Sequence, residues 1–351
     1  MSASQPPVLR SLLFHTHDAS RPLKPSAFGA LSHAIHETLH FALDGDVEDW
    51  AAAPSLQAPC GPNEEAEQQQ ARHSEEEEEL TPRPGFAPPV APADDDERAY
   101  ISYHFSDDGT LALPHPDTIA ADRSPDPCAA GADRSALDVT AKFFLLSASA
   151  GSQERGAAPL VEDALQALEA STGIEQVDTA ILEFPLLRLG EPAPSGDEEL
   201  VRRTWSALSP SPRIAALGVA SASLPSLRVI FADVPAANGS AHTQASAYRT
   251  PSLVTIDVGK MRTPCSWDRE LKQWCEERGT ELGTGNDGDD VLPKETLPTL
   301  LAEFADRLPV PLPANARLVP RWCMKYTILI RDRGVLADQS WILRCDVETD
   351  A

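Results

Sequence analysis

Apolar residues recur along the chain with two different periods, and the two periods alternate. Short apolar runs, typical of buried strands, are followed by longer segments with apolar residues three or four positions apart, as in amphipathic helices. The predicted strands cover 139–148, 179–184, 214–220, 252–258, 325–330 and 340–345, and the predicted helices cover 159–171, 198–209, 224–234 and 267–279. A separate helix is predicted over 26–43, behind Ser26 as its N-cap.

This alternation predicts parallel strands joined by right-handed crossovers, because each helix must cover the strand pair that it connects. A doubly wound sheet and a closed (β/α) barrel both fit. A nucleotide-binding doubly wound sheet normally has a GxGxxG turn after its first strand, and no such turn follows 139–148. We therefore expect an α/β fold of the TIM-barrel type. We expect it to be incomplete at its C-terminal end, since the strands at 325–330 and 340–345 have no helix between or after them.

Proline is unevenly distributed, and its distribution predicts the domain organisation. The chain has 32 prolines in 351 residues, and 51–99 is a tract of Pro, Glu, Gln and Ala with few large apolar residues. Such a segment buries too little surface to offset its ordering entropy, so we interpret it as a disordered acidic insertion. Residues 1–50 then form an N-terminal arm and helix of the barrel domain, and 100–351 form the rest of it. Shorter tracts of similar composition are expected to be loops, at 106–135, 188–197, 235–250 and 283–290.

The charge balance excludes some classes of partner. The 29 basic and 54 acidic side chains give a net charge of −25, which disfavours nucleic acid and anionic membrane surfaces. No segment has the roughly 18 consecutive apolar residues of a membrane span. The six cysteines are scattered without a CxxC pair, so we expect reduced thiols, no zinc site and a cytoplasmic protein.

Four segments together carry a resemblance to a known family. VTAKFFLLSASAG, VDTAILEFP, IAALGVASASLPSL and LVPRWCMKYTILIRDRGVLADQSWIL occur in this order, within residues 137–347. They are similar to the regulatory (modifier) subunits of glutamate–cysteine ligase, which belong to the aldo-keto reductase-like proteins. The third segment alone is shared with the wider reductase superfamily, whereas the closing segment is specific to the regulatory subunits. The family's animal members often have adjacent cysteines where this chain has Gly259 and Lys260, so no thiol role is expected there.

The resemblance implies a binding function rather than catalysis. It implies a regulatory subunit that binds the ligase's catalytic subunit, shifts its substrate affinity and relieves feedback inhibition by glutathione. The closing segment is unusually rich in aromatic and basic residues for this chain, which is the composition of an interface core. We therefore predict partner contacts there, with core packing as the alternative for the aromatic residues. The predicted contact residues are Arg321, Trp322, Met324, Lys325 and Tyr326.

The alternative function is an NADPH-dependent aldo-keto reductase that uses Lys142 and Glu183. The resemblance places Lys142 at the superfamily's catalytic lysine and Glu183 at its substrate-orienting histidine. Carbonyl reduction also needs a proton donor, usually a tyrosine whose pKa the lysine lowers. Asp95 and Tyr100 have the family's spacing but lie in or beside the acidic tract, and we interpret the match as accidental. We therefore expect Lys142 and Glu183 to be vestigial.

Three further features favour no cofactor and no metal. Arg331 and Arg333 are the only basic residues near the last strands that could hold a dinucleotide, so we expect no cofactor, with NADP vestigial at most. The glycines of LGTGNDGDD, at 283–290, lie among three aspartates and lack a following GK[ST], which indicates a loop rather than a phosphate site. Helical spacing puts His33, His36 and His40 on one stripe, but no nearby acidic residue completes a metal motif. We interpret them as a solvated helix face.

Overall fold

The computed structural model describes most of the predicted barrel domain. The predicted insertion at 51–99 lies outside the described residues. The described residues are 8–16, 30–44, 102–122, 134–146, 155–185, 197–232, 249–257, 269–285, 287, 290–313 and 315–349.

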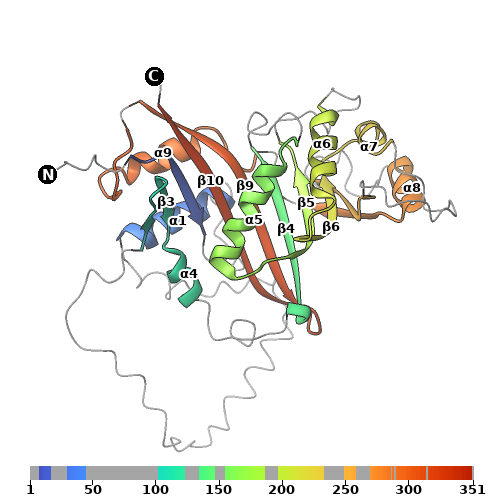
Figure 1. Ribbon diagram of the computed structural model, residues 1–351, viewed down its shortest axis with the longest axis horizontal. Helices are drawn as coiled ribbons and strands as arrows, with labels where there is room; N and C mark the ends of the chain where they lie inside the picture. The colour runs from blue at the N-terminus through green and yellow to red at the C-terminus, as the bar shows by residue number, and fades with distance from the viewer. Residues whose placement is uncertain are drawn as a thin grey trace, which may run out of the picture. The chain divides into compact units, whose positions relative to one another are not determined.

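Ten strands form one mixed sheet (Figure 1). Their order is β2-β3-β1-β10-β9-β4-β5-β6-β7-β8. The pairs from β4 to β8 are parallel, whereas β1, β10, β9 and β4 pair successively in antiparallel fashion. The strands are β1 (Ser11–His15), β2 (His104–Phe105), β3 (Thr110–Leu113), β4 (Leu137–Leu145), β5 (Val177–Glu183), β6 (Ile214–Ala220), β7 (Leu253–Asp257), β8 (Glu281–Gly285), β9 (Ala316–Ile330) and β10 (Val335–Thr349).

The helices belong to two apolar clusters. One cluster contains side chains of α5, α6, α7 and α8 together with the strands from β4 to β7, and α5 also lies against β9 and β10 (Figure 1). The other contains side chains of α1 and α9 with β1, β3 and β10. The helices are α1 (Ala30–Asp44), α4 (Pro116–Asp122), α5 (Ala158–Thr172), α6 (Glu198–Leu208), α7 (Leu224–Ile230), α8 (Arg269–Arg278) and α9 (Thr296–Glu303), with a short 3-10 helix at Arg134–Ala136.

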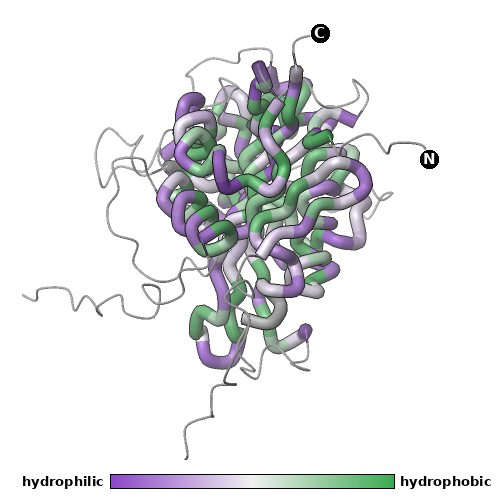
Figure 2. The backbone as a smooth tube through the Cα atoms, turned by 90° about the vertical axis from the view of Figure 1, so that its left-hand side faces the viewer, coloured by the Kyte–Doolittle hydropathy of each residue, from purple (hydrophilic) through white to green (hydrophobic). Residues whose placement is uncertain are grey.

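Helix α5 shows how the sequence determines an element of the first cluster. Pro159 occupies its first turn, where a missing N–H costs nothing, and Gly173 ends it with a left-handed φ of 72°. Leu160, Ala164 and Leu168 lie at helical spacing and are buried against the sheet. Figure 2 shows the same division along the chain, with hydrophilic positions on the outer turns of helices and hydrophobic positions toward the middle of the fold.

The closed barrel that was expected is not observed in the part of the chain that the structure describes. Two features differ from it: the order of the strands, and the packing on the face of the sheet opposite α5. Among the described residues the sheet is open, ending at β2 on one side and β8 on the other. Phe144 and Trp341 lie on the face that a closed barrel would enclose, and there they belong to the cluster formed by α1 and α9. Two helices therefore cover part of this face, where a barrel would place further strands. The α/β class is confirmed, and the sheet is mixed rather than wholly parallel.

Several elements fall where loops or an arm were predicted. Strand β1 forms in the predicted N-terminal arm and pairs with both β3 and β10. Strand β3 and helix α4 lie within the predicted loop 106–135, and β8 extends into the predicted loop at Gly283 and Gly285. Strands β1, β3 and β8 have only four or five residues each, which is too short for a clear period in the local pattern. None of the helices in the described part of the chain has the length and apolar character needed to cross a membrane.

Candidate functional site

Two lysines face each other across the antiparallel pair β4–β9. Lys142 and Lys325 are register partners, and like charges directly opposite each other destabilise a sheet. Asp287 lies between them. Its Oδ2 accepts a hydrogen bond from Lys142 Nζ at 2.6 Å, and its Oδ1 accepts one from Lys325 Nζ at 3.1 Å. One carboxylate therefore offsets the repulsion between the two ammonium groups.

A second carboxylate reaches Lys142 from the end of strand β5. Glu183 is 6% exposed, and its Oε2 lies 2.5 Å from Lys142 Nζ. Its Oε1 accepts a hydrogen bond from Ser221 Oγ at 3.1 Å. Ser221 follows strand β6 with a left-handed φ of 57°, and its N–H donates to the carbonyl of Thr255. The strained turn at Ser221 thus holds a hydroxyl against Glu183.

These contacts shift the pKa values of the central pair in opposite directions. Burial alone would lower the pKa of Lys142, but the charge of Glu183 and hydrogen bonds to Asp287 and Glu183 more than offset it, so this pKa is raised. Burial alone would raise the pKa of Asp287. The hydrogen bond and charge of Lys142, together with Lys325, instead hold it below its ordinary value. Both groups are therefore charged at neutral pH, and Lys142 is a poor proton donor.

The ion pairs lie at a cavity of about 270 Å³ on this face of the sheet. Apart from the two lysines and Asp287, its lining is mainly hydroxyl-bearing and small, so it offers hydrogen bonds to a small polar molecule. The charges at the cavity balance, since Glu183 and Asp287 oppose two lysines. The residues that line it are Thr140, Lys142, Ile181, Thr255, Thr284, Gly285, Asp287, Lys325 and Thr327.

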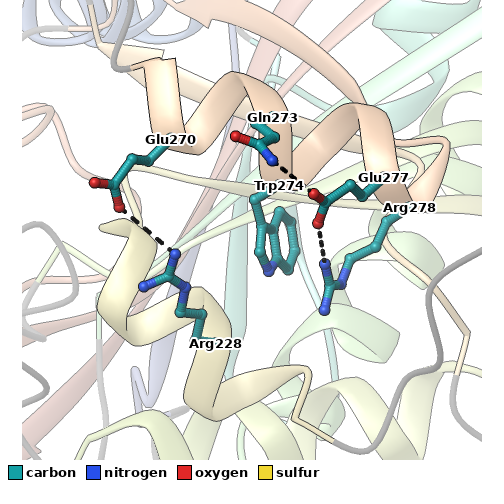
Figure 3. Close-up of a pocket in the computed structure, with 6 residues that line it drawn as sticks. All are labelled: Arg228, Glu270, Gln273, Trp274, Glu277 and Arg278. Carbon is teal, nitrogen blue, oxygen red and sulfur yellow. Dashed lines mark hydrogen bonds and ion pairs between the residues drawn. The ribbon is translucent and has the colours of Figure 1, made fainter.

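A larger hollow of about 510 Å³ lies between helices α7 and α8 (Figure 3). Arg228 of α7 reaches Glu270 of α8 at 3.6 Å, and the Arg278 guanidinium lies 4.5 Å from the centre of the Trp274 ring. Its charged side chains are thus engaged with one another. It contains no pairing of a nucleophile with a base, so the cavity at Lys142 is the better candidate for chemistry.

The structure corrects the prediction that the aromatic residues of the closing segment contact a partner. Trp322, Met324 and Tyr326 are 0% exposed and belong to the core. The indole N–H of Trp322 donates to Asp163 of α5 at 2.7 Å. Alternation along a strand puts these three side chains on the same face, beneath α5, so they cannot touch another protein while the fold is intact.

The other two predicted contact residues keep partly exposed side chains. The Arg321 side chain is 24% exposed and lies 3.2 Å from Asp346. The Lys325 side chain is 29% exposed and belongs to the cavity described above. The structure thus separates the closing segment into buried and accessible residues.

Tyr326 lies on the opposite side of the sheet from Lys142. Its hydroxyl lies 2.9 Å from His15 Nε2 and donates to Asp338 Oδ2 at 3.1 Å. His15 therefore belongs to strand β1 and is buried, within the segment predicted as an N-terminal arm. Tyr103, the other tyrosine in the described part of the chain, is 38% exposed. Asp95 and Tyr100 lie outside the described residues.

Arg331, a predicted dinucleotide contact, is held at the far end of β4. Its guanidinium donates to the Leu137 carbonyl at 3.0 Å and to Asp178 at 2.7 Å. Asp178 also accepts hydrogen bonds from Arg134 and from the Val139 N–H. Arg331 thus helps to join β4, β5 and the β9–β10 turn, whereas Arg333 is exposed in that turn.

Asp287 is the site residue that sequence reasoning missed. It lies in LGTGNDGDD, which was interpreted as an anionic loop without a role. A cluster of aspartates directly after a strand was the available signal, because the ends of parallel strands meet at one edge of a sheet. Cys275 is 1% exposed and belongs to the core.

Comparisons with known proteins add little to this picture. No family model matches the sequence, and no curated protein matches it. Among solved structures, the chain is similar to an aldo/keto reductase from Brucella melitensis, with a TM-score of 0.31 and 16% identity. That match covers 58% of this chain and 79% of the reductase.

Proposed function

We propose that the protein is a non-catalytic regulatory subunit of glutamate–cysteine ligase. In this role it binds the catalytic subunit and modulates its substrate affinity and its feedback inhibition by glutathione. The sequence resemblance over 137–347, above all in the closing segment, supports the family. The observation that supports a non-catalytic role is the pairing of Lys142 with both Glu183 and Asp287.

This pairing bears on reductase chemistry because that chemistry depends on how the lysine's charge is used. A catalytic lysine lowers the pKa of a tyrosine that donates the proton. Here the ammonium group lies between two carboxylates, and its pKa is raised. Among the described residues, Tyr326 is bound on the opposite face and Tyr103 is exposed. Lys142 therefore stabilises the sheet rather than activating a proton donor.

The path of the chain after β9 supports the same conclusion. A dinucleotide's pyrophosphate is usually held at the N-terminus of a helix. After Ile330 the described chain makes a short turn and continues as β10, which pairs with β9 along its length. No helix N-terminus therefore lies between β9 and β10 to receive a phosphate.

The accessible part of the closing segment is where we place the contact with the catalytic subunit. At the β9–β10 turn, Val335 is 51% exposed and Leu336 is 36% exposed, and they are among the few large apolar side chains exposed in the described residues. Arg333 lies beside them and is also exposed. Arginine is enriched at interfaces, and exposed apolar side chains beside it supply surface that can be buried on binding. Arg321, in the first half of β9, is kept as a further contact.

The test is association with the catalytic subunit, followed by an assay of γ-glutamylcysteine synthesis. We expect the wild-type protein to co-purify with the catalytic subunit and to raise its activity at low glutamate and in the presence of glutathione. Val335→Asp with Leu336→Asp should weaken association at least tenfold. Arg228→Glu, on the distant helix α7, is the control and should leave association unchanged. A wild-type protein that neither binds nor activates the catalytic subunit overturns the proposal.

The reductase alternative has its own measurement. Purified protein is mixed with NADPH and a panel of aldehydes, and the loss of the dihydronicotinamide absorbance is followed. We expect no turnover above the rate without protein. Turnover that Lys142→Met abolishes would establish the reductase function that uses Lys142 and Glu183.

A further inference from the structure

Helices α1 and α9 bring together two histidines and a glutamate that are far apart in sequence. His36 and His40 are four residues apart on α1, and Glu303 is the last residue of α9. One nitrogen of each imidazole and one oxygen of the carboxylate all lie within 4.8 Å of one another. His36 Nε2 lies 3.4 Å from Glu303 Oε1. The acidic residue that the sequence pattern lacked is thus supplied by another helix.

We propose that His36, His40 and Glu303 bind a divalent transition-metal ion of the zinc type. Two imidazoles and a carboxylate are the ligand set of open zinc sites, in which water takes the fourth position. With metal–ligand bonds of about 2.0–2.1 Å, two ligands of a tetrahedral ion lie roughly 3.3 Å apart. The separation of 3.4 Å between His36 Nε2 and Glu303 Oε1 matches this spacing and is long for a hydrogen bond.

The carboxylates near Nδ1 of the two imidazoles provide a second argument for a metal site. Metal-bound histidines almost always pair their other ring nitrogen with a carboxylate or carbonyl, which fixes the ring. His40 Nδ1 lies 2.7 Å from Asp44 Oδ2, and His36 Nδ1 lies 3.6 Å from Glu37 Oε1. Asp44 is itself held by two hydrogen bonds of 2.6 Å from Arg307. His40 thus has a hydrogen-bonded carboxylate at Nδ1, and His36 has a carboxylate within 3.6 Å of Nδ1.

The ring of Phe304 lies beside the cluster and restricts the two imidazoles. It makes edge-to-face contacts with His36 at 5.7 Å and with His40 at 4.8 Å between ring centres. The guanidinium of Arg307 lies over this ring, 4.2 Å from its centre. An apolar wall next to the ligands limits their rotation and excludes some water, and both effects favour metal binding.

The position of the site gives the ion a structural effect. Helix α1 follows strand β1 and α9 follows strand β8, yet both cover the same face of the sheet (Figure 1). An ion held by both helices joins the N-terminal helix to the C-terminal part of the chain. Because the unfolded chain does not hold these ligands together, binding stabilises the folded state. This inference does not depend on the proposed function.

The test is a zinc titration of the full-length protein, prepared without a histidine tag and freed of metal by a chelator. A chromophoric chelator competes for the ion, and the melting temperature is measured with and without zinc. We expect saturable binding of one ion to this site and a higher melting temperature. We expect His36→Gln, His40→Gln and Glu303→Gln each to weaken it at least tenfold.

Two control variants carry histidines outside the cluster. His33→Gln changes a third histidine on α1, and His115→Gln changes a histidine whose ring lies 5.1 Å from that of His104. Both should bind zinc with the wild-type affinity. Circular dichroism without metal checks that each variant is folded, and cobalt substitution should give the absorption bands of a tetrahedral ion. Absence of binding by the wild-type protein, equal binding by the three ligand variants, or equal loss in His33→Gln would each overturn the proposal.

Discussion

Asp163 of helix α5 accepts a hydrogen bond from the indole N–H of Trp322, at 2.7 Å. The other oxygen of the same carboxylate accepts one from Arg344 on strand β10, also at 2.7 Å. One side chain thus joins α5 to two neighbouring strands. Because Trp322 is fully buried beneath this helix, its contribution is to packing and to the position of α5.

Replacing Trp322 should therefore lower the free energy of unfolding, and the loss should be larger when more of the side chain is removed. We expect Trp322→Ala to lower the free energy of unfolding by about 3–5 kcal/mol, because it leaves a large cavity in the core. Trp322→Phe keeps most of the apolar volume and removes only the donor to a charged acceptor, so we expect a loss of about 1–3 kcal/mol. Urea unfolding measures both. Equal stability of the wild-type and Trp322→Ala proteins would contradict the placement of this side chain in the core.

The bridge at Asp287 predicts a loss of stability in acid. Its folded pKa is lowered, so it adds stability above the unfolded pKa of about 3.9, and this contribution is lost as the pH falls through the folded value. Asp287→Asn removes the carboxylate shared by Lys142 and Lys325 and leaves Glu183, which contacts Lys142, as the remaining counter-charge. We expect it to lower the free energy of unfolding by about 3 kcal/mol at neutral pH, and by less as the pH falls below about 4.

Asp290→Asn is the matched control, since Asp290 lies in the same loop, is exposed and bonds only locally to the Leu292 N–H. Its unfolding free energy should stay close to that of the wild-type protein at every pH. A difference between wild-type and Asp287→Asn that does not change with pH would show that the bridge is absent.

Three buried cysteines predict a pattern of thiol reactivity. Burial raises the pKa of Cys275 to about 11, and it also raises the pKa values of Cys323 and Cys345. Since the thiolate is the reactive form, we expect alkylation of these thiols in the native protein at neutral pH to be on the order of 100-fold slower than after unfolding. Mass spectrometry of peptides gives the extent at each cysteine. Rapid native labelling of Cys323 or Cys345 would show that the β9–β10 pair opens.

The sequence pattern was sufficient to predict the parallel strands of the sheet and the helices that connect them. The parallel strands β4 to β7 and their helices carry long apolar runs and clear helical spacing, so each was predicted close to its observed position. Helix 224–234 was predicted too long, since α7 ends at Ile230. The strands that join the sheet through distant partners were missed or shortened. Strand β1 has only five residues, and its pairing with β10 depends on residues more than 300 positions away.

Closure of the predicted barrel was not confirmed, because closure is not a property of local pattern. The alternation of strands and helices is the same in an open and in a closed sheet. What differs is whether the edge strands meet, and here α1 and α9 pack against the face that a barrel would enclose. The apolar side of α1 was recognised, but the surface that it covers could not be read from its sequence.

The candidate sites show the same limit. Lys142 and Glu183 were identified by resemblance, and in the structure their side chains are in contact. Asp287 lies 145 positions from Lys142, and Glu303 lies 267 positions from His36, so neither partner is visible in a sequence window. In the closing segment, the aromatic residues were predicted to contact a partner because interfaces are rich in such residues. Buried core strands are rich in them too, so composition alone could not separate the two.

The place of strand β10 has a consequence for how the chain is made. It comes after every other described strand along the chain, yet it lies inside the sheet, between β1 and β9. Strands β4 to β8 can pair while the ribosome is still adding residues. Strands β1 and β3 join the same sheet only through β10, so they cannot do so until residues 335–349 have been made. Until then the nascent protein exposes the apolar face around β1, and chaperones that protect such surfaces should be needed for a good cellular yield.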